Sequence, residues 1–181
     1  LGENERLAKQ GLRVMATARR DFDAASFDAD GDMLDLMQDL TLLALVGIVD
    51  PPRPTAKVAI ATAHSAGIQV RMITGDHAVT AEAIGEMLAL GPGVISGPEL
   101  QALPDEELAG RLPQLHVFGR VSPEDKLRLA RSMQQQGLIV AMTGDAVNDA
   151  AALKQADIGV AMGSGSEVTK QAARMVLTDD N

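Results

Sequence analysis

The chain contains no cysteine, tryptophan or tyrosine, and only three of its 181 residues are phenylalanine. The absence of cysteine excludes disulfide bonds and thiolate metal sites. A core must therefore be built from aliphatic side chains and nine methionines, which suits parallel strands covered by helices on both faces. The few aromatic side chains and the formal net charge of −9 argue against nucleic acid as a partner.

Long apolar runs are also missing. The longest, residues 40–49, falls well short of the roughly 20 residues that a membrane-spanning helix needs. The chain begins with Leu1 followed by polar residues, and no signal-peptide pattern is present. These features predict a cytoplasmic segment that has been cut from a longer polypeptide.

Short apolar strands alternate with helical segments from residue 39 onward. Strands are expected at residues 12–18, 39–49, 68–73, 115–119, 138–142, 158–162 and 174–177. Helices are expected at residues 3–10, 55–66, 79–90, 122–136, 150–155 and 166–173, and one or two short helices within residues 98–112. The glycine-rich residues 91–97 are expected to form a turn. This alternation predicts an α/β fold with a right-handed, doubly wound parallel sheet.

Two of the expected strands end in the same sequence, Thr-Gly-Asp, at residues 74–76 and 143–145. Ligands of open α/β sheets bind at the carboxyl ends of the strands, so both motifs lie where an active site is expected. Each motif is also compatible with an ordinary turn in which Thr and Asp cap the backbone. The repetition of the motif at two strand ends favours a functional site.

The second motif continues with further oxygen-bearing side chains. Asp145, Asn148 and Asp149 lie within five residues, and such side chains suit Mg²⁺ held by one or two carboxylates with water and phosphate. Asp149 also lies where a helix is expected to begin, so it could instead cap that helix.

Two cations are expected near the same edge. Arg120 follows a strand, and Lys126 lies near the start of the helix that Ser122 and Pro123 are expected to begin. A lysine on a helix is usually a solvated surface charge, but two cations at this edge would suit a phosphoryl group. The three histidines are far apart in the sequence and predict no histidine metal site.

The acidic stretch Asp-Ala-Asp-Gly-Asp at residues 28–32 resembles both the start of a calcium loop and the nucleophile motif of soluble phosphatases. A calcium loop needs glycine where Met33 stands. A nucleophile should follow an apolar strand, whereas Ala25, Ser26 and Phe27 make a poor one. The stretch is therefore interpreted as an exposed acidic loop.

Three longer stretches make the sequence similar to the P-type ATPases of the haloacid-dehalogenase-like superfamily. Residues 45–77, 118–126 and 143–181 resemble, in order, the mid-domain signature of that family, the segment around its invariant lysine, and its hinge-and-magnesium motif. The Asp-Pro-Pro-Arg form at residues 50–53 is similar to the type II pumps, which move calcium, sodium/potassium or protons.

The resemblance implies roles for single residues at the first motif. Thr74, Gly75 and Asp76 match the segment that contacts the transferred phosphoryl group and the nucleotide. Lys126 matches the lysine that neutralises phosphate charge. Thr74 and Lys126 are therefore expected to be catalytic, and ATP is the expected substrate.

The second motif and two arginines receive their roles in the same way. Asp145 matches the ligand of Mg²⁺, the expected cofactor. Asn148 and Asp149 match residues that support the ion and the phosphate, so Asp149 is expected to be both a metal ligand and catalytic. Arg13 and Arg120 match arginines near the ATP phosphates.

Three departures from the family pattern stand out. The family has glycine where Ala146 stands and proline where Ala151 stands. If position 146 required a positive φ, alanine would cost about 1 kcal/mol and alter the magnesium loop. The phosphorylated aspartate lies in an Asp-Lys-Thr-Gly-Thr motif, and this motif does not occur in the chain.

The resemblance implies a particular division of the chain. Residues 1–38 would be a remnant of the nucleotide-binding domain, and residues 39–181 the C-terminal part of the phosphorylation domain. The haloacid-dehalogenase-like, Rossmann-type sheet would be incomplete, because its first strand carries the missing aspartate. We expect this chain to bind magnesium and phosphate weakly, not to phosphorylate itself, and to self-associate or accept another segment in the gap.

The parent protein would be a multi-pass pump of a bacterial plasma membrane that couples ATP hydrolysis to cation transport through an aspartyl-phosphate. Its actuator, nucleotide and membrane domains would be the partners of this segment. Two alternatives remain open at this stage. One is a stand-alone phosphatase of the same superfamily, with Asp28 as its nucleophile, and the other is a non-enzymatic nucleotide-binding module.

Overall fold

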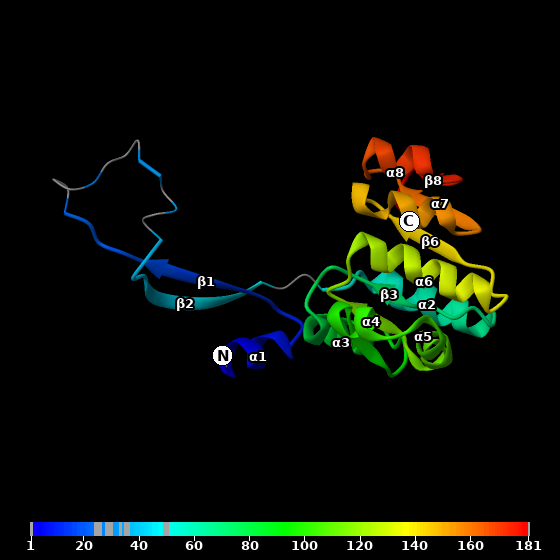
Figure 1. Ribbon diagram of the computed structural model, residues 1–181, viewed down its shortest axis with the longest axis horizontal. Coiled ribbons are helices and arrows are strands. Elements are labelled where there is room, and N and C mark those ends of the chain that lie inside the picture. Colours follow the sequence, from blue (N-terminus) through cyan, green and yellow to red (C-terminus); the bar gives the residue numbers. More distant parts are fainter. Residues whose placement is uncertain are drawn as a thin grey trace. The chain divides into compact units, whose positions relative to one another are not determined.

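The computed structural model describes residues 2–23, 27, 31–32, 34, 37–48 and 51–180. The chain forms two compact units, and the boundary between them lies between Pro51 and Pro52. This division lies beyond the boundary expected after residue 38, because strand β2 (Thr41–Ile48) pairs antiparallel with β1 (Arg13–Arg19) and not with the later strands. Figure 1 shows β1 and β2 as the blue and cyan arrows.

The first unit consists of helix α1 (Gly2–Ala8) and the β1–β2 ladder. Leu42 and Leu43 are neighbours in β2 and therefore point to opposite faces of the ladder. They are 61% and 60% exposed, so neither face is covered at this point. Residues 28–30 of the acidic stretch, including the alternative nucleophile Asp28, lie outside the described residues.

The second unit alternates strands with helices, which confirms the α/β class. Its strands are β3 (Met72–Ile73), β4 (Val94–Ser96), β5 (Val117–Gly119), β6 (Ala141–Gly144), β7 (Ile158–Met162) and β8 (Met175–Leu177). Its α-helices are α2 (Pro54–Ser65), α3 (Ala78–Met87), α4 (Gly97–Ala102), α5 (Asp105–Arg111), α6 (Pro123–Gln135), α7 (Ala150–Gln155) and α8 (Glu167–Ala172). Two short 3-10 helices are η1 (Leu112–Gln114) and η2 (Val147–Asp149).

The parallel strands form two sheets of three strands each, in the orders β3-β5-β4 and β6-β7-β8, and not one continuous sheet. Within the described residues, β3 pairs with β5 alone and β6 pairs with β7 alone. The expected incomplete sheet is therefore observed as two sheets, each ending in an edge strand with unpaired backbone groups. Strand β4 lies in the stretch that was expected to be a turn.

The first sheet is covered on both faces around β5. Phe118 is fully buried in the main core cluster, together with Leu112 and Leu129. Its neighbour Val117 points to the opposite face and packs in a second cluster, against which Ile60 of α2 is partly buried. Full burial of a side chain such as Phe118 or Val117 stabilises the fold by about 1.5–3 kcal/mol. The first sheet is therefore doubly wound as expected.

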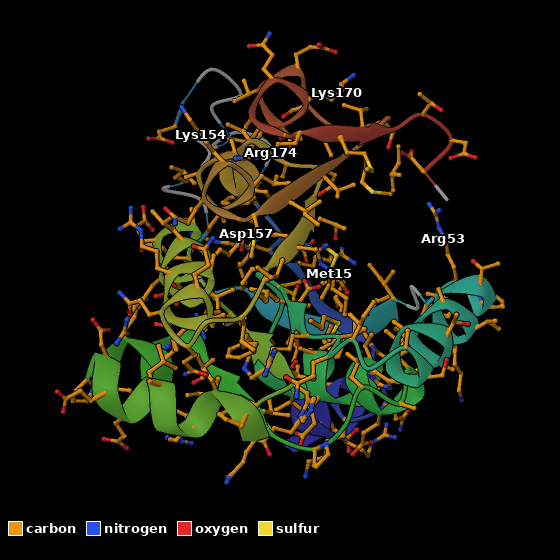
Figure 2. The ribbon with its side chains drawn as sticks, turned by 90° about the vertical axis from the view of Figure 1, so that its right-hand side faces the viewer. Met15, Arg53, Lys154, Asp157, Lys170 and Arg174 are labelled. Carbon is orange, nitrogen blue, oxygen red and sulfur yellow. The ribbon has the colours of Figure 1, made fainter. Side chains whose placement is uncertain are left out.

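The second sheet is covered less completely. Ala161 in the middle of β7 is fully buried, but Ile139, just before β6, is 78% exposed. The amino end of β6 is fixed by Asp157, whose carboxylate accepts hydrogen bonds from the Val140 amide (2.9 Å) and Gln134 Nε2 (3.1 Å). The Val140 bond is the main cause of the lowered pKa of Asp157, and the charge of Arg174 contributes as well (Figure 2).

Helix α6 connects the two sheets, since it contacts α4 and α5 on one side and α7 on the other. Figure 1 shows it between these two groups of helices. Ser122 caps its first turn, because the Ser122 hydroxyl accepts from the Asp125 amide (3.2 Å) and the Asp125 carboxylate accepts from the Ser122 amide (2.8 Å). The predicted N-cap at Ser122 is thus confirmed. None of the described helices is long and apolar enough to cross a membrane.

Candidate functional site

The first Thr-Gly-Asp motif is tied to the end of β5 by main-chain hydrogen bonds. The Thr74 amide donates to the Phe118 carbonyl (2.9 Å), and the Val121 amide donates to the Thr74 carbonyl (3.2 Å). One residue earlier, the Arg120 amide donates to the Asp76 carbonyl (2.6 Å). The carboxyl ends of β3 and β5 are therefore held together, with Thr74, Asp76 and Arg120 at one edge.

Within this loop the Thr74 hydroxyl closes a local turn. It accepts a hydrogen bond from the Asp76 amide (3.0 Å) and donates one to Asp76 Oδ2 (3.3 Å). The ordinary turn that the sequence allowed for this motif is therefore present in the structure. Gly75 between them is exposed, and a Cβ atom there would meet nothing within 4 Å. Neither close packing nor a positive φ requires glycine at this position. Because glycine has no side chain, a ligand can approach the backbone here closely.

The second motif ends β6 and is held by Asp149. Asp149 Oδ2 accepts hydrogen bonds from the amides of Asp145 and Ala146, both at 3.2 Å. Asp149 is only 7% exposed, and a Cβ atom at Gly144 would lie 2.5 Å from the Asp149 Cβ. Glycine at 144 is therefore needed so that Asp149 can reach back under the loop.

The other oxygen of Asp149 binds Lys126. The distance from Lys126 Nζ to Asp149 Oδ1 is 2.6 Å, and the two side chains are 17% and 9% exposed. The structure thus brings Lys126, Asp145 and Asp149 together. Both carboxylate oxygens of Asp149 are already engaged, so this residue holds the loop and orients the lysine.

Asp145 and Asn148 differ from Asp149 because both are exposed. Within the described part of the chain, neither side chain has a hydrogen-bond partner. The donor set available to a cation is therefore one free carboxylate and one amide, which fits Mg²⁺ because that ion keeps several water ligands. No cluster of three or more acidic or histidine side chains suited to a metal occurs among the described residues.

The two departures from the family pattern are accommodated without strain. Ala146 has φ −97° and ψ 156°, an extended conformation that any residue adopts, so the expected cost of a positive φ does not arise. Ala151 is exposed in the first turn of α7.

Two residues that support the second motif were not predicted. The Ser166 amide donates to the Asp145 carbonyl (2.8 Å), and the Thr169 hydroxyl donates to the Ala146 carbonyl (2.7 Å). Thr169 is fully buried. The available sequence signal was the run of small and hydroxyl residues after β7, at the same edge of the sheet.

The remaining predicted residue, Arg13, opens β1 in the first unit. In the second unit, Arg53 is tied to the end of the described chain, since its Nη1 donates to the Asp180 carbonyl (3.2 Å) (Figure 2). The Asp180 carboxylate accepts from the amides of Gly163 (2.6 Å) and Ser164 (3.3 Å). Hydrogen bonding to Ser164 is the main cause of the lowered pKa of Asp180.

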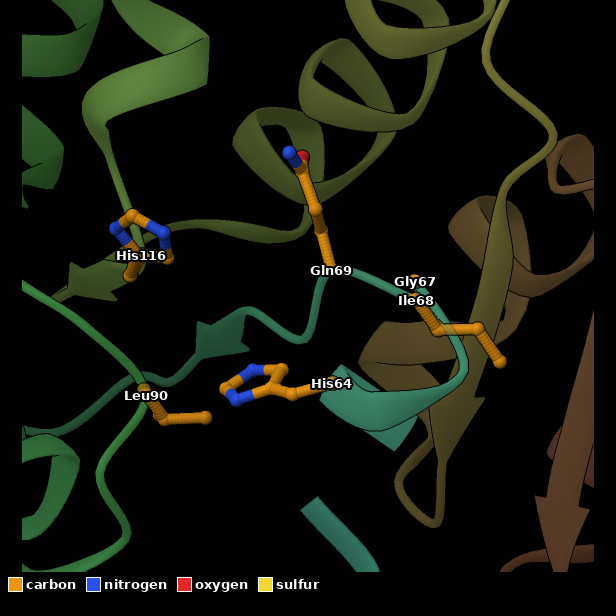
Figure 3. A pocket seen from close by; sticks show the side chains of 6 residues that line it. All are labelled: His64, Gly67, Ile68, Gln69, Leu90 and His116. Atoms are coloured by element: carbon orange, nitrogen blue, oxygen red, sulfur yellow. The ribbon is translucent and has the colours of Figure 1, made fainter. Parts of the chain in front are cut away.

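A pocket of about 270 Å³ lies elsewhere in the second unit (Figure 3). Its lining residues are His64, Gly67, Ile68, Gln69, Leu90 and His116. Because Gln69 and His116 precede β3 and β5, the pocket is at the amino ends of these strands, opposite to the Thr-Gly-Asp edge. His64 and His116, which are 52 residues apart in the sequence, thus line the same pocket.

The family model of the haloacid dehalogenase-like hydrolases matches residues 2–157. The chain belongs to this family. As in other α/β folds, the loops at the carboxyl ends of the strands of this haloacid dehalogenase-like hydrolase carry the candidate site.

Curated relatives extend the likeness over nearly the whole chain. The chain is 48% identical over 181 residues to a calcium-transporting ATPase of Listeria monocytogenes and 49% identical over 179 residues to one of Bacillus subtilis. These alignments cover 98% and 97% of the chain but only 20% of each relative. A probable cation-transporting ATPase F of Mycobacterium tuberculosis is 48% identical over 189 residues, with 100% of the chain and 21% of the relative covered.

A solved structure supports the same assignment. The catalytic domain of the CPx-ATPase CopB-B superposes with a TM-score of 0.57 at 26% sequence identity, covering 80% of this chain and 47% of that one. The resemblance to P-type ATPases is thus confirmed, and the chain spans about one fifth of the length of the curated relatives it matches.

Proposed function

We propose that the second unit of this haloacid dehalogenase-like hydrolase is part of the phosphorylation domain of a cation-transporting P-type ATPase. In this proposal, the parent protein hydrolyses ATP through an aspartyl-phosphate and couples that reaction to cation movement across a membrane. The first unit would then be a part of the nucleotide-binding domain, with Arg13 near the ATP phosphates. The remainder of the pump would be the partner of both units.

The observation that carries the proposal is the Lys126–Asp149 pair beneath the Asp145 loop, in a chain nearly half identical throughout to cation-transporting ATPases. A phosphoryl group carries negative charge that must be neutralised, and a lysine and a metal ion are the usual means. Lys126 is held at the edge of the sheet by a buried carboxylate. Asp145 is held beside it with its own carboxylate free.

Each residue has a defined task in this proposal. Asp145, assisted by Asn148, would hold Mg²⁺, which when bound would offset the charge of the phosphoryl group. Lys126 would bind a phosphate oxygen with its ammonium group. Asp149 would act as a positioning residue and not as a direct metal ligand, because its two oxygens accept from Lys126 and from two backbone amides.

The first motif would serve the same phosphate. Thr74 and Asp76 are fixed at the end of β3, and the exposed Gly75 between them leaves the backbone accessible to the phosphoryl group or nucleotide. Arg120 is at the same edge and would add a further positive charge.

The experiment is phosphorylation of the parent protein with labelled ATP and Mg²⁺. We expect an acid-stable, hydroxylamine-labile phosphoprotein in the parent, and its loss in Asp145→Asn and Lys126→Met. The 181-residue chain itself contains no Asp-Lys-Thr-Gly-Thr sequence and should incorporate no label. A labelled acyl phosphate on the chain alone would refute this part of the proposal. Calcium is the first cation to test in transport, because four of the relatives are named as calcium-transporting.

The open edges of β3 and β6 are explained by the same proposal. A strand of the parent placed between them would join the two sheets and satisfy both edges. The stand-alone phosphatase is the alternative within the family. Turnover of p-nitrophenyl phosphate by the 181-residue chain, lost in Asp28→Asn, would favour that alternative.

A further inference from the structure

Arg120 has an unusual backbone conformation. It follows β5 with φ 53°, in the left-handed region that residues other than glycine rarely adopt. The other described non-glycine residues with positive φ are Asp39, Ala89 and Asp180. Aspartate tolerates this region, and Ala89 directly follows the C-cap of α3, where a left-handed residue commonly ends a helix. Neither explanation applies to Arg120.

The main chain of Arg120 joins three strand ends. Its amide donates to the Asp76 carbonyl at 2.6 Å, and the amide of the next residue, Val121, donates to the Thr74 carbonyl at 3.2 Å. Its own carbonyl lies against Gly97, which follows β4, since a Cβ atom at Gly97 would be 2.1 Å from that oxygen. The left-handed turn at Arg120 therefore determines where the loop after β3 is held.

The arginine side chain does not explain the fold of this turn. Arg120 is exposed, and in the described part of the chain its guanidinium has no hydrogen bond or ion pair. Glycine would adopt the same backbone with less strain. An exposed, unpartnered side chain at a strained position is a feature of functional sites, where strain is retained for positioning.

We propose that Arg120 is a positioning residue whose left-handed main chain, and not its charge, fixes the Thr74-Gly75-Asp76 loop. The loop's task in binding a phosphoryl group rests on the proposed function above. The positioning itself does not, because it follows from the hydrogen bonds of residues 120 and 121.

The test uses the 181-residue chain with Arg120→Gly, Arg120→Lys and Arg120→Val, followed by NMR and amide hydrogen exchange. Arg120→Gly should raise the Tm by about 2–4 °C and leave the Thr74 and Asp76 amide signals in place. Arg120→Lys should behave like the unsubstituted chain. Arg120→Val, which is β-branched, should shift those signals and reduce the exchange protection of the residue 120 and Val121 amides about tenfold or more.

Matched controls come from Ala89, which has a similar positive φ of 55° but follows the C-cap of a helix. Ala89→Gly should raise the Tm and Ala89→Val should lower it, and neither should move the Thr74 and Asp76 signals. If Arg120→Val does not fold, Gly97→Ala is the second variant, because its Cβ would push against the carbonyl oxygen of Arg120. It should shift the Thr74 and Asp76 signals in the way expected for Arg120→Val.

A titration with inorganic phosphate and Mg²⁺ is followed at the Thr74 and Asp76 signals of fully folded protein. It separates the effect of the loop's position on phosphate binding from the effect of the arginine charge. Arg120→Val should bind at least threefold more weakly than Arg120→Gly, although both lack the guanidinium. The inference is overturned if Arg120→Gly disturbs the loop as much as Arg120→Val, or if neither Arg120→Val nor Gly97→Ala disturbs it. If the unsubstituted chain binds no phosphate, the proposed function is weakened, while the exchange data still decide the positioning role.

Discussion

Replacing Asp149 by alanine should be far more costly than replacing Asp145, four residues earlier in the same loop. Asp149 accepts a charge-assisted hydrogen bond from Lys126 at 2.6 Å, and bonds of this kind contribute about 1.5–3 kcal/mol. It also accepts from two backbone amides at 3.2 Å, for which roughly 0.5–1 kcal/mol each is appropriate. Asp149→Ala removes all three acceptor contacts together.

The expected loss is about 3 kcal/mol in the free energy of unfolding of the second unit. Removing one partner of a fully buried ion pair costs about 3–5 kcal/mol, but Lys126 is 17% exposed and can turn partly toward water. We therefore expect the lower end of that range. Asp149→Asn keeps an acceptor for some of these donors and should lie between alanine and the original residue.

Asp145→Ala provides the control, because its exposed side chain has no partner among the described residues. It should leave stability unchanged within experimental error. Urea unfolding followed by far-UV circular dichroism is the assay, since the chain has neither tryptophan nor tyrosine for fluorescence. The reasoning would be refuted by a loss below about 1 kcal/mol for Asp149→Ala, or by an equal loss for Asp145→Ala.

Three further predictions follow from the fold. The lowered pKa of Asp157 means that the stability it contributes is present above about pH 4 and is lost as the pH falls through that lowered value. Asp157→Asn should therefore flatten the dependence of Tm on pH below about pH 4, and an unchanged slope would contradict this. Gly144→Ala should destabilise the fold by about 1–3 kcal/mol in the same urea assay, because its Cβ would lie 2.5 Å from the Asp149 Cβ, whereas Gly75→Ala should have no effect on stability. The open edges of β3 and β6 should make the 181-residue chain self-associate with rising concentration in sedimentation velocity, and a single monomeric species throughout would count against this.

Local sequence patterns predicted most elements of the second unit. Helix α6 could be placed because Ser122, Pro123 and Asp125 form a strong start signal, and the start was confirmed by the capping hydrogen bonds. Strand β4 was missed because Gly91 and Gly93 closely precede it and indicate a turn. Strand β3 is shorter than expected, since only Met72 and Ile73 of the apolar run 68–73 form a ladder.

Pairings between distant residues were less accessible. Nothing in the residue pattern indicates that β2 pairs with β1, or that the six parallel strands separate into two sheets. In the site, the sequence placed Asp145 and Asp149 in one loop but could not distinguish their tasks. That distinction depends on Lys126, 23 residues away, and on the backbone amides to which Asp149 turns.

The position of α6 between the two groups of helices has a mechanical consequence. A helix of 13 residues is a rod about 20 Å long. Lys126, near its first turn, binds Asp149 at the carboxyl edge of the second sheet, while Gln134, in its last turn, binds Asp157 at the opposite end of the same sheet. The rod is thus fastened to the second sheet at both ends and also contacts α4 and α5. A change in the distance or angle between the two sheets would be transmitted along this rod to the ammonium group of Lys126, so that the assembly of the domain and the charge at its site would be mechanically coupled.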